Sequence, residues 1–249
     1  MTTEYGYTGY EDTAPVRTRR RHPWRTVIIV LIVLLGLLVA LDFGARAFAQ
    51  NKMASEIQQQ GFPKKPDVSI QGFPFLTQVI SRDFKSILIS SGNITEGPLE
   101  IQSIHATMTG VHVNSSFQSG TVDHLHGTMT VTFPALANAM ISQAGDLGSL
   151  VGSGLTLSDA GNNEVKASLN LLGGLASGTA VWKVTRTGDR QIHVHLVSST
   201  GLGTEALGGI SDIKVPLPSL PMGMTIQSIN VTPTGLVAVV TGQNVAFGS

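Results

Sequence analysis

The chain of 249 residues has no cysteine, few charges and few aromatic side chains. Without cysteine, the protein has no disulfide bonds, no thiolate metal site and no cysteine nucleophile. Asp, Glu, Lys and Arg make up 13% of the chain, about half of the usual ~25%. A domain with so few charges must cover its surface with hydroxyl groups and glycine, or leave apolar surface that another molecule covers.

The formal net charge is zero, but the charges are distributed unevenly. Residues 1–26 contain five arginines and three acidic residues, so this segment carries +2 (5 − 3) and the remainder −2. The charges of the remainder form no runs, and we therefore expect no nucleic-acid partner. Residues 1–25 have too few apolar side chains to fold, which predicts a disordered tail.

One long apolar run extends from Val27 to Leu41. As a helix it spans about 23 Å, less than the ~30 Å hydrocarbon core of a bilayer. Flanking residues must therefore extend the span, with Arg25 reaching the interface. We predict a transmembrane signal anchor at residues 26–45. The excess of arginine before the run places the N-terminus in the cytoplasm and the C-terminal domain outside a plasma membrane.

A cleavable signal peptide is the alternative for the same segment. The basic N-terminal region, the apolar core and Ala47-Phe48-Ala49 fit such a peptide, cut after Ala49. Against it, the basic region is unusually long, and Asp42 and Arg46 lie between the core and the cut. The anchor is favoured, and a cleaved, secreted form stays open. Both alternatives export the domain.

Helical spacing of Phe48, Met53 and Ile57 predicts a stalk helix at residues 46–62. Residues 63–249 are expected to form a β-rich extracytoplasmic domain, because apolar residues alternate with polar ones along much of this segment. The strands are expected around 68–70, 87–89, 99–108, 125–133, 179–185, 191–197, 224–231 and 236–240. Along 99–108 the apolar face changes, which predicts a bulge or turn near Ser103.

A helix is predicted after Pro134, within an amphipathic segment that extends to Val151 and is broken near Gly145. The fold class is therefore α+β: a curved, mostly antiparallel sheet that wraps on a helix, preceded by one transmembrane helix.

Two His-x-His pairs, His124/His126 and His193/His195, are the residues most suggestive of chemistry. In a strand this spacing places both imidazoles on one face, and four would converge on a metal if the strands were neighbours. Such pairs are more often polar residues of a half-exposed sheet, so we expect no metal. No nucleophile elbow, phosphate-binding loop or zinc-protease helix motif is present. We expect no enzyme activity and no cofactor.

Large apolar residues cluster around Pro74 and on the predicted helix. Core packing explains any one of them, but together they can leave an apolar groove for acyl chains. The candidate lipid-binding residues are Phe73, Phe75, Leu76, Phe84, Ile87, Ile89, Leu136, Met140 and Ile141.

Three segments carry a family resemblance: VSIQGFPFL at 68–76, LPSLPMGM at 217–224 and VTPTGLVAVVTG at 231–242. With them the chain resembles the actinobacterial LmeA-like phospholipid-binding family from about residue 50 to 247. The resemblance implies an envelope protein that binds phospholipid and, in mycobacterial relatives, supports lipoglycan maturation. It also implies a fold similar to tubular lipid-binding proteins, with a curved antiparallel sheet around a long helix.

Our leading hypothesis is an anchored phospholipid-binding protein that supports envelope lipid or lipoglycan homeostasis. One alternative is a scaffolding envelope protein whose apolar surface binds a partner subunit, which the sequence does not identify. Another is a metal-dependent hydrolase that uses the His-x-His pairs.

Overall fold

The computed structural model describes residues 23–59, 62–96, 99–143, 154–171, 176–187, 191–201, 212–216 and 224–248. The predicted tail as far as residue 22, and the predicted helical segment beyond residue 143, lie outside the described residues. The chain forms two units, Met1–Leu41 and Asp42–Ser249.

Helix α1 (Pro23–Gln59) contains the described part of the first unit. The side chains of its apolar run are exposed, including Leu31, Leu35 and Leu38. By length and composition, this helix is able to cross a membrane. The expected N-terminal apolar helix is therefore present.

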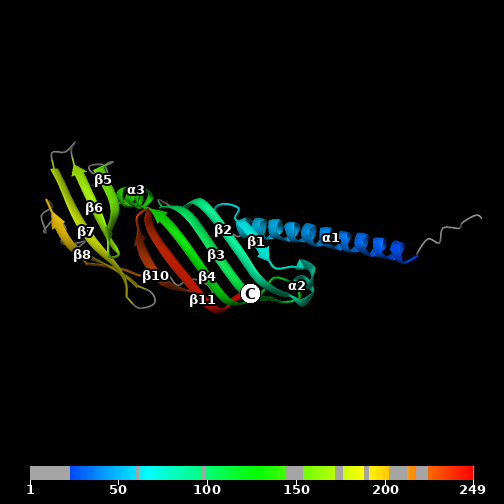
Figure 1. The fold of residues 1–249 in the computed structure, drawn as a ribbon. Coiled ribbons are helices and arrows are strands. Elements are labelled where there is room, and N and C mark those ends of the chain that lie inside the picture. The colour runs from blue at the N-terminus through cyan, green and yellow to red at the C-terminus, as the bar shows by residue number, and fades with distance from the viewer. Residues whose placement is uncertain are drawn as a thin grey trace, which may run out of the picture. The chain divides into compact units, whose positions relative to one another are not determined.

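The second unit contains two antiparallel sheets and two short helices (Figure 1). The first sheet has the order β1-β2-β3-β4-β11-β10, and the second has the order β5-β6-β7-β8-β9. The strands of the first sheet are β1 (Asp67–Gln71), β2 (Asp83–Glu96), β3 (Leu99–Val113), β4 (Gly120–Thr132), β10 (Thr225–Thr232) and β11 (Gly235–Phe247). The strands of the second are β5 (Leu155–Gly161), β6 (Glu164–Leu171), β7 (Ala176–Arg186), β8 (Gln191–Thr200) and β9 (Asp212–Pro216). The predicted α+β class and antiparallel pairing are confirmed.

Sequence reasoning missed strands β5, β6 and β9. A turn signal was available between the first two, because Gly161-Asn162-Asn163 separates alternating leucine, valine and alanine positions. Asn162 and Asn163 both have positive φ, 50° and 63°, as the tightest hairpin turns require.

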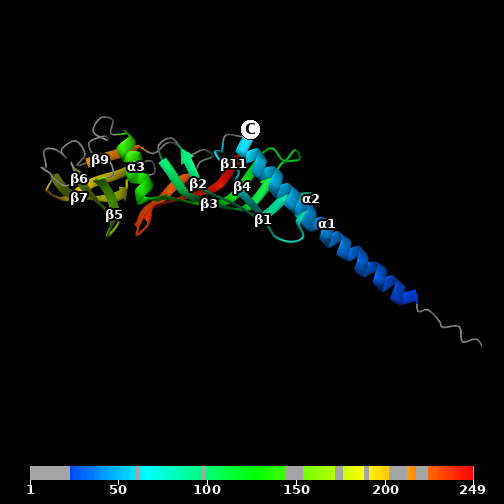
Figure 2. The same ribbon diagram turned by 90° about the horizontal axis from the view of Figure 1, so that it is seen from above.

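Among the described residues, the end of α1 and the helices α2 (Phe75–Ser81) and α3 (Phe133–Gln143) pack on one face of the first sheet, which we call the inner face. Ala45, Ala49 and Met53 of α1 recur every four residues and pack against its buried core. Helix α3 contacts β3 and β4 of the first sheet and β5 of the second, and lies between the sheets in both views (Figures 1 and 2). Residues 46–59 are thus helical, as expected of a stalk, but they cover the sheet.

Along most of each strand, every second residue faces the core. Near one end of the first sheet, the core-facing positions shift by one residue. Core residues there are three positions apart instead of two: Phe84 and Ile87 in β2, Val111 and Met108 in β3, Val122 and Leu125 in β4. These residues nevertheless pack in one cluster. The backbone allows this because Gly110 and Asn244, between the two rows, have left-handed φ values of 62° and 49°.

A second such shift lies where the sequence predicted a bulge or turn. Ile101 and Ile104 pack in the same cluster although they are three residues apart. The register between β2 and β3 is the same on both sides of Ser103, so no residue is inserted. Instead Asn93, in the partner strand, has φ 53°. The predicted change of the apolar face near Ser103 is confirmed. It results from the left-handed conformation of Asn93 and not from a bulge or turn at Ser103.

Asparagine 163 joins the two sheets through its side chain. Its Nδ2 donates hydrogen bonds to the carbonyl oxygens of Val184 in β7 (2.6 Å) and Ile229 in β10 (3.1 Å). Its Oδ1 accepts a hydrogen bond from the backbone N–H of Val231 (2.6 Å). Apolar residues of both sheets also pack together in one core cluster around Phe133.

We predict that Asn163→Gly lowers the free energy of unfolding by about 3 kcal/mol, because three hydrogen bonds of about 1 kcal/mol each are lost while the positive φ is retained. Asn162→Gly, at the adjacent exposed turn position, is the matched control and should change it by less than about 0.5 kcal/mol. Chemical denaturation of the full chain in detergent, followed by circular dichroism, measures both. Equal effects of the two substitutions would contradict the role of the Asn163 side chain.

Candidate functional site: the inner face of the first sheet

Two apolar rows cross the middle of the inner face. They include Val68 and Ile89, at the edge of the cluster at α1, and Ile104 and Met129, at the edge of the cluster at α3. Paired residues of an antiparallel sheet point to the same side, so the register defines each row. The first row is Val68, Ile89, Ala106, Gly127 and Val240, and the second is Ser91, Ile104, Met129 and Ala238. We call these two rows the middle rows.

The middle rows are less buried than the core on either side. Ile87 and Val122 are only 2% and 1% exposed, whereas every residue of the middle rows except Gly127 is partly exposed. The rows carry no charge and a single hydroxyl group. They provide a continuous apolar surface whose side chains are incompletely covered.

The single hydroxyl of the middle rows, Ser91 Oγ, is buried and has no hydrogen-bond partner among the described residues. A buried polar atom without a partner costs about 1–3 kcal/mol, and such atoms are uncommon in native proteins. Ser91 is paired with Ile104, so its hydroxyl lies among apolar side chains.

The structure gathers part of the predicted site. Phe75, Phe84 and Ile87 are core residues, exposed by 8% or less, and Leu76 and Ile89 pack beside them. Leu136 packs in the cluster at α3. Phe73 and Met140 are instead exposed, and Ile141 is partly exposed on α3. A lipid-binding role for these nine residues stays a prediction.

The GFPFL element forms the turn from β1 into α2 (Phe75–Ser81), and Asp42 of α1 holds it in place. Pro74 occupies the N-cap position of α2, and its side chain cannot accept a hydrogen bond. The buried Asp42 carboxylate accepts from the backbone N–H groups of Phe75 (2.9 Å) and Leu76 (2.7 Å) instead. A cap is therefore supplied from 33 residues upstream.

Gly72 is favoured in this element by its backbone conformation, which L side chains rarely adopt. Its φ is 100°, and a Cβ at this position would lie 2.9 Å from Gln78 Nε2. The buried Gln78 lies beneath the turn, where its Oε1 accepts from the backbone N–H of Lys85 (3.0 Å). Gln78 thereby joins α2 to the start of β2.

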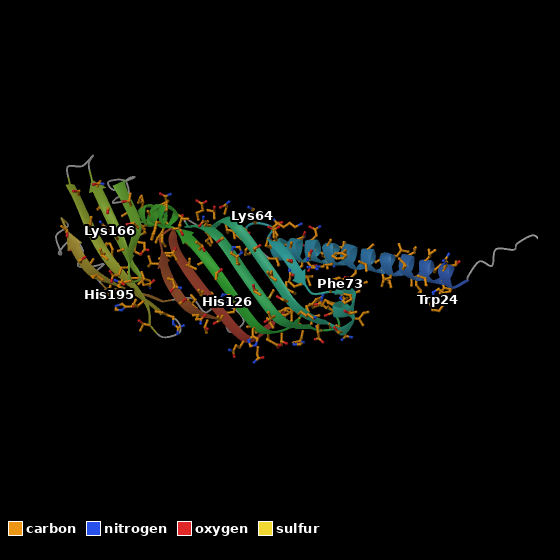
Figure 3. The ribbon with its side chains drawn as sticks, in the orientation of Figure 1. Trp24, Lys64, Phe73, His126, Lys166 and His195 are labelled. Carbon is orange, nitrogen blue, oxygen red and sulfur yellow. The ribbon has the colours of Figure 1, made fainter. Side chains whose placement is uncertain are left out.

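The two His-x-His pairs lie in different sheets. His124 and His126 are exposed on β4, and His193 and His195 belong to β8, as the labelled His126 and His195 show in Figure 3. The described residues contain no group of three or more histidine or acidic side chains able to hold a metal ion. The four imidazoles therefore do not come together, as a four-histidine metal site would require.

A different histidine, His112, lies between two carboxylates. Its Nδ1 is 2.6 Å from Asp83 Oδ1, and its Nε2 is 3.4 Å from Asp123 Oδ1. The hydrogen bond to Asp83, supported by that to Asp123, raises the pKa of His112 above 6.5. This exposed group belongs to the end of the sheet beside α2.

We predict that Asp42→Ala lowers the free energy of unfolding by about 2–4 kcal/mol, because two buried backbone N–H groups lose a charged acceptor. Glu56→Ala is the matched control, since its carboxylate is exposed on the same helix and pairs with the exposed Lys52 at 3.8 Å; it should cost less than about 1 kcal/mol. Thermal unfolding of the full chain measures both. A stable Asp42→Ala protein would show that α2 does not need this cap.

Comparison with known proteins identifies the family. Residues 40–241 match the model of the LmeA-like phospholipid-binding family. No curated protein matches the chain, and no solved structure matches it. The matched region begins beside Asp42 and includes the GFPFL element, the second sheet, and the first sheet as far as Thr241 in β11. This chain belongs to the LmeA-like phospholipid-binding family.

Proposed function

We propose that this protein is a membrane-anchored, extracytoplasmic phospholipid-binding protein that supports lipid or lipoglycan homeostasis of the cell envelope. The family supports phospholipid binding. The observation that carries the proposal is the pair of middle rows, an uncharged and partly exposed apolar surface inside a domain poor in charge. The protein binds lipid and does not catalyse a reaction on it.

The middle rows have the dimensions of an acyl chain. The first row crosses five strands, and four inter-strand spacings of ~4.8 Å add to about 19 Å. One leaflet of a ~30 Å hydrocarbon core is roughly 15 Å deep, so an extended chain fits along a row. Each methylene group removed from water contributes about 0.8 kcal/mol.

Ser91 gives the lipid a polar contact. Its hydroxyl lacks a partner among the described residues, and a phospholipid ester oxygen would accept its hydrogen bond. Binding would then remove the cost of the buried hydroxyl, and it would do so only for a ligand with an acceptor beside its acyl chain.

The proposed anchor is the uncleaved helix α1. A cut after Ala49 would remove Asp42, which caps α2, together with Ala45 and Ala49, which pack on the sheet. The domain is therefore complete only when residues before the cut stay attached. The arginine-rich N-terminus places the tail in the cytoplasm and the domain outside.

We predict that the membrane-bound protein retains residues 1–49. Intact-mass spectrometry of the protein from the membrane fraction should give the mass of the full chain, 26.2 kDa. A mature form that begins at Gln50 would contradict both the anchor and the structural need for Asp42.

We predict that Ala106→Phe lowers phospholipid binding by roughly tenfold. The larger side chain would displace about two methylene groups of the ligand, and ~1.6 kcal/mol is slightly more than a tenfold change. Thr107→Phe is the matched control, because Thr107 is the next residue of β3 and points to the opposite face. Circular dichroism confirms that both variants are folded.

Binding is measured on the full chain in vesicles that contain a photoactivatable phospholipid, with the cross-linked peptides mapped by mass spectrometry. Adducts on β2–β4 should be abundant in the native chain and in Thr107→Phe, and scarce in Ala106→Phe. Adducts on residues 23–41 should be unchanged throughout. Adducts confined to residues 23–41 in the native chain would overturn the proposed function.

A further inference from the structure

Exposed apolar side chains gather at the α2 end of the first sheet. In the described part of the second unit, eight large apolar residues are exposed: Phe43, Phe48, Phe73, Ile80, Leu88, Phe117, Met140 and Val197. Four of them, Phe43, Phe73, Ile80 and Phe117, belong to α1, the GFPFL turn, α2 and the β3–β4 loop. We call these four residues the apolar corner.

Direct contacts bring the elements of the corner together. The rings of Phe43 and Phe73 stack with centroids 6.1 Å apart. Phe73, which is labelled in Figure 3, lies just before α2 in the sequence, and α2 carries Ile80. At the end of α2, the carbonyl oxygen of Arg82 accepts a hydrogen bond from the N–H of Val113 (3.0 Å). Val113 is the last residue of β3, so the loop with Phe117 starts beside α2.

Phe117 is held in an unfavourable conformation that exposes it. Its φ is 59°, a left-handed value that is rare for a bulky side chain and costs of order 1 kcal/mol or more. Asn114 fixes the loop: its carbonyl oxygen accepts from the N–H of Phe117 (3.1 Å), and its Oδ1 accepts from the N–H of Gln118 (3.1 Å). The loop thus presents to solvent an aromatic ring that is 49% exposed.

The chemistry of the corner fits the polar–apolar boundary of a bilayer. Phe43 follows Leu41, the last residue of the apolar run, by two positions, about 3 Å of helix. Arg82 and Lys85 are exposed next to the corner, where they are able to pair with lipid phosphates. Of the acidic residues nearby, Asp42 is buried under α2, and Asp83 and Asp123 both pair with His112.

We propose that the apolar corner inserts into the interfacial region of a phospholipid bilayer, so that the folded domain itself docks on the membrane. This inference rests on the proposed anchoring and extends it to a second membrane contact. The buried Phe75 of α2, about 140° around the helix from Ile80, packs in the cluster of the inner face. Docking by the corner therefore places the membrane one short helix away from the lipid-binding surface.

The chain contains no cysteine, so single-cysteine variants allow nitroxide labels at chosen positions. The test uses the full chain in vesicles of phosphatidylcholine and phosphatidylglycerol, with labels at Phe73→Cys and Phe117→Cys. Val197→Cys is the matched control, because Val197 lies in the second sheet and is 49% exposed, like Phe117. Accessibility of each label to oxygen and to a water-soluble nickel chelate is measured by electron paramagnetic resonance.

The labels at residues 73 and 117 should be protected from nickel and accessible to oxygen, with at least about a tenfold higher oxygen-to-nickel ratio than the label at 197. A difference of this size corresponds to ~1.4 kcal/mol of partitioning. Nickel-accessible labels at both positions would overturn the inference. Labels protected from both reagents would indicate a protein partner on the corner and would overturn it as well.

The cross-linking experiment on β2–β4 separates this inference from the proposed function. Adducts on the inner face together with water-exposed labels would reject only the docking of the corner. Membrane-embedded labels without adducts on the inner face would reject only the lipid-binding site.

Discussion

The buried carboxylate of Asp42 is the interaction on which the arrangement of the second unit depends. It joins α1 to the first turn of α2, and α2 in turn fixes the start of β2 through Gln78. One acidic residue, 25 positions before the first strand, thereby determines how the helix covers the sheet. Without a charged acceptor at this point, two backbone N–H groups would be buried without partners, which is among the costlier defects in a protein interior.

Much of the fold followed from alternation and turn chemistry. The long run predicted at 125–133 is a strand as far as Thr132, although Phe133 already begins α3. The strands predicted on either side of Thr187-Gly188 are present as β7 and β8, because one buried face imposes a period of two. The helix over the sheet could not be found in this way. Ala45, Ala49 and Met53 are too small or too sparse to distinguish a packed helix from a stalk, and only the tertiary contact reveals their face.

The sequence predicts that the candidate site is apolar, but it does not predict which residues form its partly exposed surface. Phe75, Phe84 and Ile87 were predicted to bind lipid because they are large and apolar. In the structure, residues of this kind fill the core. The incompletely covered rows consist of smaller residues such as Ala106 and Val240, which carry no signal in a single sequence. Left-handed residues in mid-strand, such as Asn93, also change which positions face inward, and no periodicity rule anticipates them.

The order of strands in the first sheet governs the order in which this domain is able to form during synthesis. Strand β4 pairs with β11, although the whole second sheet lies between them in the sequence. Strand β4 therefore keeps an open edge until residues 235–247 have been synthesised. Pairing over such a separation is slow. The edge of β4 is thus exposed to pairing with other chains for longer than any edge that a neighbouring hairpin closes.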